Sequence, residues 1–167
     1  MTMQTSLTAL TAEDVDELLP LCQAFCDEDS HSFDPVQIRR ALLGLVQRPH
    51  FGTTLVLRHE GRPVGYAVVT LGWSLEGGGL DALLDELYLV PAVRGEGRGA
   101  ALVEAALDHA AQLGAGRMFC EVEPHNDQAR RLYRRLGFET EPSQMLLRTL
   151  ADRRRSPWTG RGARITP

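Results

Sequence analysis

A glycine-rich run at residues 94–100 constrains the fold of this chain more than any other feature of its sequence. The run reads Arg94-Gly95-Glu96-Gly97-Arg98-Gly99-Ala100. The apolar residues 81–90 before it predict a central strand, and the Ala- and Leu-rich residues 97–113 after it predict a helix that ends at Gly114. A turn of this kind presents backbone N–H groups at the positive end of a helix dipole, where a pyrophosphate binds. The run therefore predicts an α/β fold whose strand-to-helix turn holds a phosphorylated ligand.

Length and composition favour a single folded domain. The chain has 167 residues, of which 43% are hydrophobic and 24% are charged, which is enough apolar material for one core. We expect this domain to cover residues 1–150 and a basic, disordered tail to cover residues 151–167. No segment approaches the ~20 apolar residues of a spanning helix, and the first residues lack the pattern of a signal peptide. The sequence thus predicts a cytoplasmic protein with no membrane partner.

Strands are predicted where β-branched and apolar residues cluster between turn signals. An antiparallel hairpin is expected around the turn at residues 60–63, and residues 74–80, with three successive glycines, are expected to form a mobile loop. The six expected strands cover residues 5–10, 53–59, 64–73, 81–90, 117–122 and 145–150.

Helices are predicted where apolar residues recur every three to four positions. The first starts near a weak capping box formed by Thr11 and Asp14, and Pro20 is expected to end, kink or restart it. A second helix is expected between Asp34, as its N-cap, and Pro49. The last helix is expected at residues 126–136, beginning at the first or second of these positions.

Cysteine, histidine and lysine usage limits the chemistry that this chain can carry. Cys22, Cys26 and Cys120 include no Cys-x-x-Cys pair, and the five histidines lack the spacing of a helical zinc site. We therefore expect buried free thiols and no metal. All 18 basic residues are arginines, which excludes a Walker-type phosphate loop because that loop requires a lysine.

The glycine-rich turn fits two phosphate-binding patterns. Gly95-x-Gly97-x-x-Ala100 matches a dinucleotide fingerprint, and Glu121 follows ~20 residues later. That fingerprint requires its first glycine directly after a strand of a parallel sheet, whereas residues 91–94 intervene here and the preceding half of the chain is predicted to be antiparallel. The dinucleotide interpretation is therefore weak.

The second pattern, Arg94-x-x-Gly97-x-Gly99, resembles the acetyl-CoA turn of the GCN5-related N-acetyltransferase (GNAT) family. A second match follows at residues 126–138, as Asn126-x-x-Ala129-x-x-x-Tyr133-x-x-x-Gly137-Phe138. The resemblance covers residues 5–150 and implies a mixed, mostly antiparallel sheet of six to seven strands, flanked by four helices and splayed where acetyl-CoA enters. Residues 64–100 look most like the diamine and polyamine acetyltransferase branch, in which Trp73 would lie in an aromatic substrate loop.

The resemblance also implies roles for individual residues in an N-acetyltransferase that uses acetyl-CoA as co-substrate. Tyr133 would be the general acid beside the sulfur, although a core aromatic is the alternative. Asp85 aligns with the acid of the polyamine branch, and Glu86 would point to the opposite face of its strand, so that one of them serves as base. His125 is an alternative proton shuttle. The implied acetyl-CoA contacts are the backbone of Leu87 and Leu89, the side chain of Asn126, and Arg94, Gly95, Glu96, Gly97, Arg98, Gly99 and Ala100.

The net charge of the chain indicates the chemical class of the acceptor. Residues 151–167 hold five arginines and one aspartate; without them, 13 basic residues of the 18 face 21 acids of the 22, a net charge of about −8. An acidic body favours a small cationic amine, such as a polyamine or an aminoglycoside-like molecule. The acids expected to border the acceptor are Glu76, Asp81, Asp85, Glu86, Glu121 and Glu123.

Other functions and partners are weighed against this one. The last helix presents four arginines, at 130, 131, 134 and 135, but no stacking aromatics lie among them, which argues against nucleic acid. A non-catalytic acetyl-CoA sensor and a peptide N-terminal acetyltransferase are the alternative functions. The sequence leaves homodimerisation open.

Overall fold

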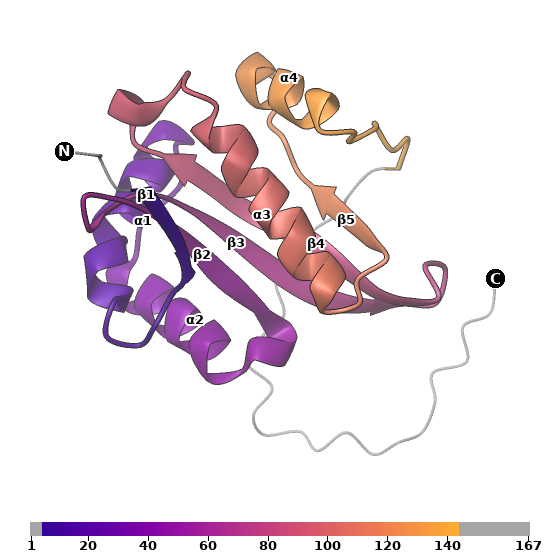
Figure 1. The fold of residues 1–167 in the computed structure, drawn as a ribbon, viewed down its shortest axis with the longest axis horizontal. Helices are drawn as coiled ribbons and strands as arrows, with labels where there is room; N and C mark the ends of the chain where they lie inside the picture. The colour runs from indigo at the N-terminus through magenta and orange to yellow at the C-terminus, as the bar shows by residue number, and fades with distance from the viewer. Residues whose placement is uncertain (1–4, 144–167) are drawn as a thin grey trace.

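A computed structural model describes residues 5–143 and shows a five-stranded sheet in this part of the chain, with helices on both of its faces (Figure 1). The strands lie in the order β1-β2-β3-β4-β5, and every neighbouring pair is antiparallel except β4 and β5. They are β1 (Thr5–Ala9), β2 (Gly52–His59), β3 (Arg62–Ser74), β4 (Gly79–Leu89) and β5 (Arg117–Cys120). The mixed, mostly antiparallel sheet is confirmed, and the parallel dinucleotide fold is excluded.

The four helices within the described residues lie where the sequence predicts helices. They are α1 (Val15–Glu28), α2 (Pro35–Gln47), α3 (Arg98–Gln112) and α4 (Asp127–Arg135); short 3-10 turns cover Pro49–Phe51 and Pro91–Val93. The expected strand at 145–150 and the expected tail at 151–167 lie outside the described residues. A count of six to seven strands is therefore not confirmed.

Local sequence signals set several of these boundaries. Asp34 caps α2 by accepting hydrogen bonds from the backbone N–H groups of Val36 and Gln37. The β2–β3 hairpin turns through Glu60 and Gly61, both at positive φ, as a two-residue turn between twisted strands requires. These short-range devices form as the sequence predicts.

The start and the course of α1 correct two predictions. Thr11 does not cap the helix, because its hydroxyl bonds Glu13, and Asp14 at the N-cap position makes no side-chain cap bond. Pro20 neither ends nor restarts α1, which continues to Glu28, so that of the three expected effects only a kink stays a prediction. The N–H that proline lacks would bond the carbonyl of Asp16, and both residues are exposed, so water can satisfy that carbonyl.

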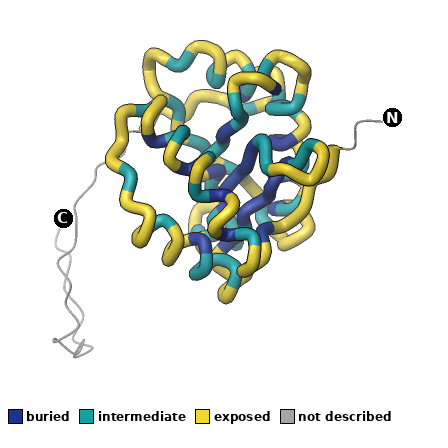
Figure 2. Tube along the Cα trace, turned by 90° about the vertical axis from the view of Figure 1, so that its left-hand side faces the viewer, coloured by how far each residue is buried: buried dark blue, intermediate teal, exposed yellow. Residues whose placement is uncertain are grey.

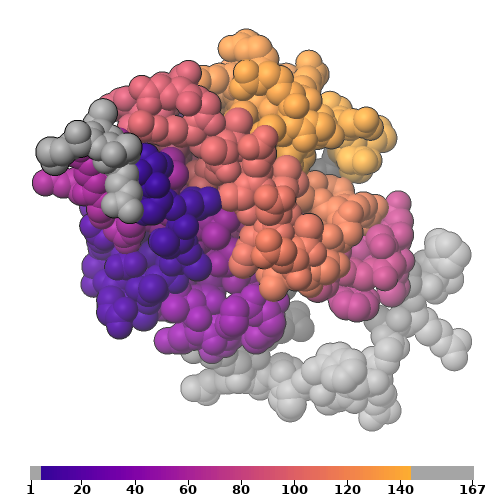
Figure 3. Space-filling model, viewed as in Figure 1, coloured from indigo at the N-terminus to yellow at the C-terminus, as the bar shows by residue number. Residues whose placement is uncertain are grey.

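Two apolar clusters, one on each face of the sheet, form the core. Helices α1 and α2 pack on one face around Val15, Leu18 and Tyr66. Helix α3 packs on the other face through Leu102 and Val103, and α4 lies beside it (Figure 3). Buried segments accordingly gather along the central strands (Figure 2).

The loop expected at residues 74–80 is a hairpin turn instead. Ser74 of β3 pairs with Gly79 of β4, so only residues 75–78 lie between the strands. The Ser74 hydroxyl accepts a hydrogen bond from the N–H of Gly77 at 2.9 Å, and Gly78 takes a positive φ. The glycines therefore allow a tight turn rather than a long loop.

A β-bulge in β4 changes which face its side chains reach. Val68 of β3 pairs with Glu86, but the next residue, Val69, pairs with Leu84, so Asp85 is an extra residue. One extra residue reverses the alternation of side chains along a strand. Leu84 packs in the α3 cluster, whereas Tyr88 packs in the α1–α2 cluster.

Candidate active site

Strands β4 and β5 separate at the bulge, as the expected splay requires. They pair only over Asp81–Leu84 and Arg117–Cys120, while β4 continues to Leu89. At the end of β4, the N–H of Val90 donates to the carbonyl of Val64 on the β3 side. Because successive residues direct their backbone groups to opposite edges, Leu87 and Leu89 direct theirs to the open edge. The carbonyl of Leu89 there accepts a hydrogen bond from Arg94 Nε at 2.8 Å.

A cleft of about 370 Å³ occupies the gap. Its walls come from the C-terminal end of α1, the middle of β4, the segment after β5 and the start of α4. Among its lining residues, arginine is absent and five side chains carry a carboxylate. The lining residues are Phe25, Asp29, His31, Leu84, Asp85, Glu86, Leu87, Glu121, Val122, Glu123, Pro124, Asn126, Ala129 and Tyr133.

The bulge brings Asp85 and Glu86 into the same cleft, which corrects the expectation that they face opposite sides. Burial raises the pKa of Glu86, the hydroxyl of Tyr66 at 2.8 Å lowers it, and the neighbouring Asp85 raises it again. Asp85 lines the cleft and is exposed, so its side chain reaches solvent while the cleft walls remove part of its hydration. This partial desolvation raises the pKa of Asp85.

The other predicted acids divide into two groups. Glu121 and Glu123 line the cleft wall after β5, as expected. Glu76 and Asp81 do not line it: Glu76 lies in the β3–β4 turn, and Asp81 is held by Arg117 at 2.8 Å, which lowers the pKa of Asp81. Trp73 is 75% exposed beside that turn and is not a cleft residue either.

Asp29 and His31 are cleft residues that the sequence did not indicate. They follow α1, and Ser30 between them takes the left-handed conformation with φ 57°. The His31 N–H closes the end of α1 on the carbonyl of Cys26. The polar run Asp-Glu-Asp-Ser-His at residues 27–31, where α1 ends, was the available signal. His125, in contrast, is exposed and does not line the cleft.

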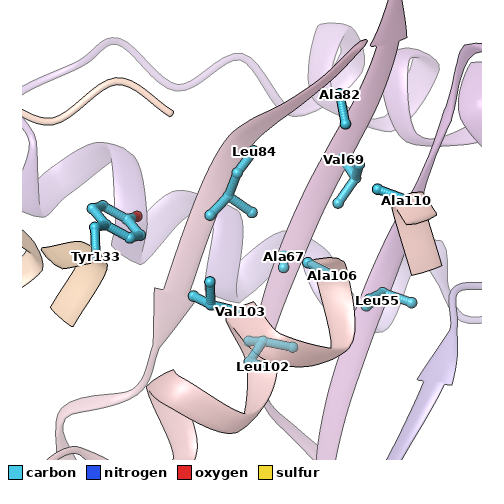
Figure 4. Packing of buried hydrophobic residues seen from close by; sticks show 10 residues of the cluster. All are labelled: Leu55, Ala67, Val69, Ala82, Leu84, Leu102, Val103, Ala106, Ala110 and Tyr133. Carbon is cyan, nitrogen blue, oxygen red and sulfur yellow. The ribbon is translucent and has the colours of Figure 1, made fainter. Parts of the chain in front are cut away.

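Tyr133 reaches the cleft from α4 and is 8% exposed. Its ring packs against Phe138 and its hydroxyl is directed toward β4 near Leu84 (Figure 4). Burial and the nearby Cys120 raise the pKa of Tyr133, so the hydroxyl stays protonated. Burial also raises the pKa of the Cys120 thiol to about 11. All three cysteines are free, and Cys22 and Cys26 are buried as predicted, whereas Cys120 is only partly buried.

The glycine-rich turn lies beyond the open edge of β4. Gly95 and Gly97 have φ of 85° and 79°, and a Cβ added at either would meet nothing within 4 Å. No side chain caps α3, whose first backbone bond runs from Ala101 to Gly97. The N–H groups of the first turn therefore have no intrahelical partner, which suits them to an anion. A Cβ added at Gly99 would lie 3.4 Å from the side chain of Leu89 and 3.5 Å from that of Leu132.

The polar side chains expected to hold acetyl-CoA already have partners in the protein. Arg94 bonds Glu28 at 2.8 Å as well as the Leu89 carbonyl, and Arg98 pairs with Glu96 at 2.9 Å. Asn126 caps α4 by accepting from the N–H of Ala129 at 3.0 Å. Its amide NH₂ is not part of that cap bond and belongs to a residue that lines the cleft. Within residues 5–143 no three His, Cys, Asp or Glu side chains are grouped as metal ligands, and no helix is long and apolar enough to span a bilayer.

Comparison with known proteins gives a family match. Residues 13–138 match the model of the Acetyltransferase (GNAT) family. An uncharacterized N-acetyltransferase of Mycobacterium tuberculosis H37Rv is 40% identical over 85 residues, which cover 51% of this chain and 51% of the relative. One from Bacillus subtilis is 32% identical over 92 residues, covering 55% and 62% of the two chains. The match thus spans about half the length of the mycobacterial relative.

Solved structures share the fold. An integron cassette protein from the mobile metagenome of Cole Harbour Salt Marsh is 29% identical, with a TM-score of 0.78 and coverage of 87% of this chain and 90% of that one. The aminoglycoside N-acetyltransferase AAC(6')-Iy, in complex with CoA, also has a TM-score of 0.78, at 14% identity and coverage of 90% and 98%.

Proposed function

Because this chain belongs to the acetyltransferase (GNAT) family, we propose that it transfers an acetyl group from acetyl-CoA to the primary amine of a small cationic acceptor, by direct attack on the thioester. The observation that carries this proposal is the single cleft in which Glu86, Asp85 and Tyr133 meet beside the open edge of β4. A base, an acid and a backbone edge that can orient an extended ligand are then within one site.

The residues present fit acetyl-CoA. The room above Gly95 and Gly97 and the unpartnered N–H groups of α3 suit a pyrophosphate. The open edge of β4 at Leu87 suits the pantetheine arm, which would bond it as an added strand does. Because Arg94 already uses the carbonyl of Leu89, Leu87 is the better backbone partner. Arg94 and Arg98 contribute positive charge to the turn.

Proton transfer falls to three side chains. An amine of pKa about 10.4 is almost fully protonated at pH 7, and preparing its neutral form costs about 4.6 kcal/mol. Glu86, partly buried at the cleft wall, accepts that proton, and the exposed Asp85 beside it passes the proton to solvent. Acetyl-CoA, when bound, supplies a thioester carbonyl and a thiolate leaving group. Tyr133, kept protonated by burial, donates its hydroxyl proton to the sulfur.

The acceptor class rests on the charge of the cleft. Asp29, Glu121 and Glu123 surround the two carboxylates of β4, so a cationic amine is attracted and a second ammonium group also finds a counter-ion. The same carboxylates stabilise the ammonium form of the acceptor and so oppose its deprotonation. A pH optimum above neutrality follows.

A thiol-release screen tests the activity and the acceptor class together. Polyamines, aminoglycosides, amino acids and peptide N-termini are supplied with acetyl-CoA, and released CoA is measured. We expect turnover with cationic amines and loss of this turnover in Glu86→Gln. In Tyr133→Phe we expect kcat to fall by a factor of roughly 10² to 10⁴ while the KM for acetyl-CoA is unchanged. A neutral or anionic best acceptor would overturn the acceptor class. CoA binding without turnover of any amine would identify a sensor module instead.

A further inference from the structure

Tyr66 places a hydroxyl directly on the proposed base. It lies on β3, is fully buried at 0% exposure, and its hydroxyl donates to Glu86 Oε2 at 2.8 Å. The two residues meet because the bulge at Asp85 turns Glu86 to the α1–α2 face, where Tyr66 packs. Without the extra residue, Glu86 would fall on the α3 side of the sheet.

The hydrogen bond is directional. The pKa of Tyr66 is raised mainly by burial and, to a smaller extent, by the negative charge of Glu86. The phenol therefore stays protonated and donates the hydrogen bond. One carboxylate oxygen of Glu86 is then committed to Tyr66. The other oxygen is left to receive a proton in the cleft that Glu86 lines.

We propose that Tyr66 is a positioning residue for the acetyl transfer. Its hydroxyl fixes the rotamer of Glu86 and favours the charged form of this base, which can then accept a proton from the amine. This inference rests on the proposed function. Tyr66 is not a catalytic residue, because its hydroxyl contacts the base and the Cys22 thiol and its side chain does not line the cleft.

Several groups act on Glu86 besides Tyr66. Burial raises the pKa of Glu86 most, Asp85 and Asp29 raise it further, and His31 lowers it. Tyr66 has the largest lowering effect. The Cys22 thiol, on the α1 side of Glu86, has a pKa raised to about 12 by burial, and that of Cys26 is also raised, so both stay neutral. Glu121, Glu123 and Tyr133 face Glu86 from across the cleft.

Tyr66→Phe removes one oxygen atom and leaves the ring that fills the core. A hydrogen bond to a charged group that is lost in this way typically corresponds to about a tenfold effect or more. We expect the acid limb of kcat/KM for the amine to move up by about one pH unit, so that kcat/KM is about tenfold lower on the acid limb itself and close to wild type at high pH. The KM for acetyl-CoA should stay unchanged.

Tyr88→Phe is the matched control. Tyr88 packs in the same cluster, 6.2 Å from the Tyr66 ring, but its hydroxyl donates to Glu28 at 3.1 Å. A general loss of core stability would affect both variants, whereas only Tyr66→Phe should move the acid limb. An acid limb that coincides in the two variants would overturn the proposal.

A second measurement separates this inference from the proposed function. Carbon-13 NMR of glutamate carboxyl groups, with the Glu86 signal assigned through Glu86→Gln, follows the titration of Glu86 without any substrate. Tyr66→Phe should raise its midpoint and Tyr88→Phe should not. If the wild type acetylates no amine but this shift is seen, the proposed function fails and the pairing stands. If the wild type is active and the midpoint does not move, the positioning role fails.

Discussion

Replacing Gly97 by alanine separates backbone strain from phosphate binding. Gly97 has φ 79° at the start of α3, and a Cβ there meets no protein atom within 4 Å. The cost to folding is therefore conformational: about 1–2 kcal/mol for an L-residue in the left-handed region. In a domain of this size that corresponds to a fall in Tm of roughly 2–8 °C.

The cost to binding has a different origin. The methyl group would occupy the space through which a phosphate approaches the N–H groups of α3. Loss of one hydrogen bond to a charged oxygen, worth about 1.5–3 kcal/mol, raises the Kd for CoA by roughly 10- to 150-fold. Isothermal titration calorimetry measures this change directly, and thermal denaturation measures the strain.

Gly114→Ala supplies the matched control. Gly114 has φ 91° at the opposite end of α3 and is equally free of neighbours, so alanine there carries a similar strain without facing the proposed phosphate. Both variants should lose similar Tm, and only Gly97→Ala should lose CoA affinity. Equal CoA affinities in the two variants would refute the assignment of the glycine-rich turn to the pyrophosphate.

Three further outcomes are expected. Glu86→Gln should raise Tm near neutral pH. Folding raises the pKa of the Glu86 carboxyl, so this group lowers the stability of the protein as the pH rises from the unfolded-state pKa to the folded-state pKa. The gain in Tm should therefore vanish in denaturation scans below about pH 4. Leu102 lies on α3 and its side chain is 0% exposed. Leu102→Ala should lower the free energy of unfolding, measured in urea, by about 2–5 kcal/mol, and a loss below 1 kcal/mol would contradict the core assignment. Raising the salt concentration from 0.1 M toward 1 M shortens the Debye length from about 10 Å to 3 Å. Steady-state kinetics should therefore show a higher KM for a cationic amine at high salt than at low salt. An unchanged KM would argue against attraction of the amine by the cleft carboxylates.

The parts of the fold that follow from short-range interactions were predictable from the sequence. Asp34 before Pro35, Glu60-Gly61 between two apolar runs, and Gly114 after α3 each specify a local backbone conformation without help from distant residues. The glycine-rich turn and Tyr133 belong to the same category, because each falls at a fixed offset within one helix or turn. The structure places the turn between β4 and α3 and Tyr133 on α4, and their roles toward acetyl-CoA stay predictions.

The features that the sequence did not indicate depend on contacts between distant residues. The bulge at Asp85 exists only as a mismatch between β3 and β4, and no property of the run 81–90 taken alone distinguishes a regular strand from a bulged one. Asp29 enters the cleft because α1 packs across β4, more than fifty positions away in the chain. Continuation of α1 through Pro20 is likewise decided by tertiary packing, since Leu18 and Cys22 on either side are buried.

The bulge links the stability of the fold to the proposed chemistry. Before the bulge, β4 must direct Ala82 and Leu84 toward α3; after it, Tyr88 must face α1 and α2. A regular strand could not satisfy both clusters, because even-numbered residues would all fall on one face. The single extra residue resolves this conflict and, at the same point, places Asp85 and Glu86 side by side where β5 ends its pairing. The charged pair thus lies at the one place in β4 where the core changes sides, and the apolar residues before and after it fix the position of Glu86 against Tyr66.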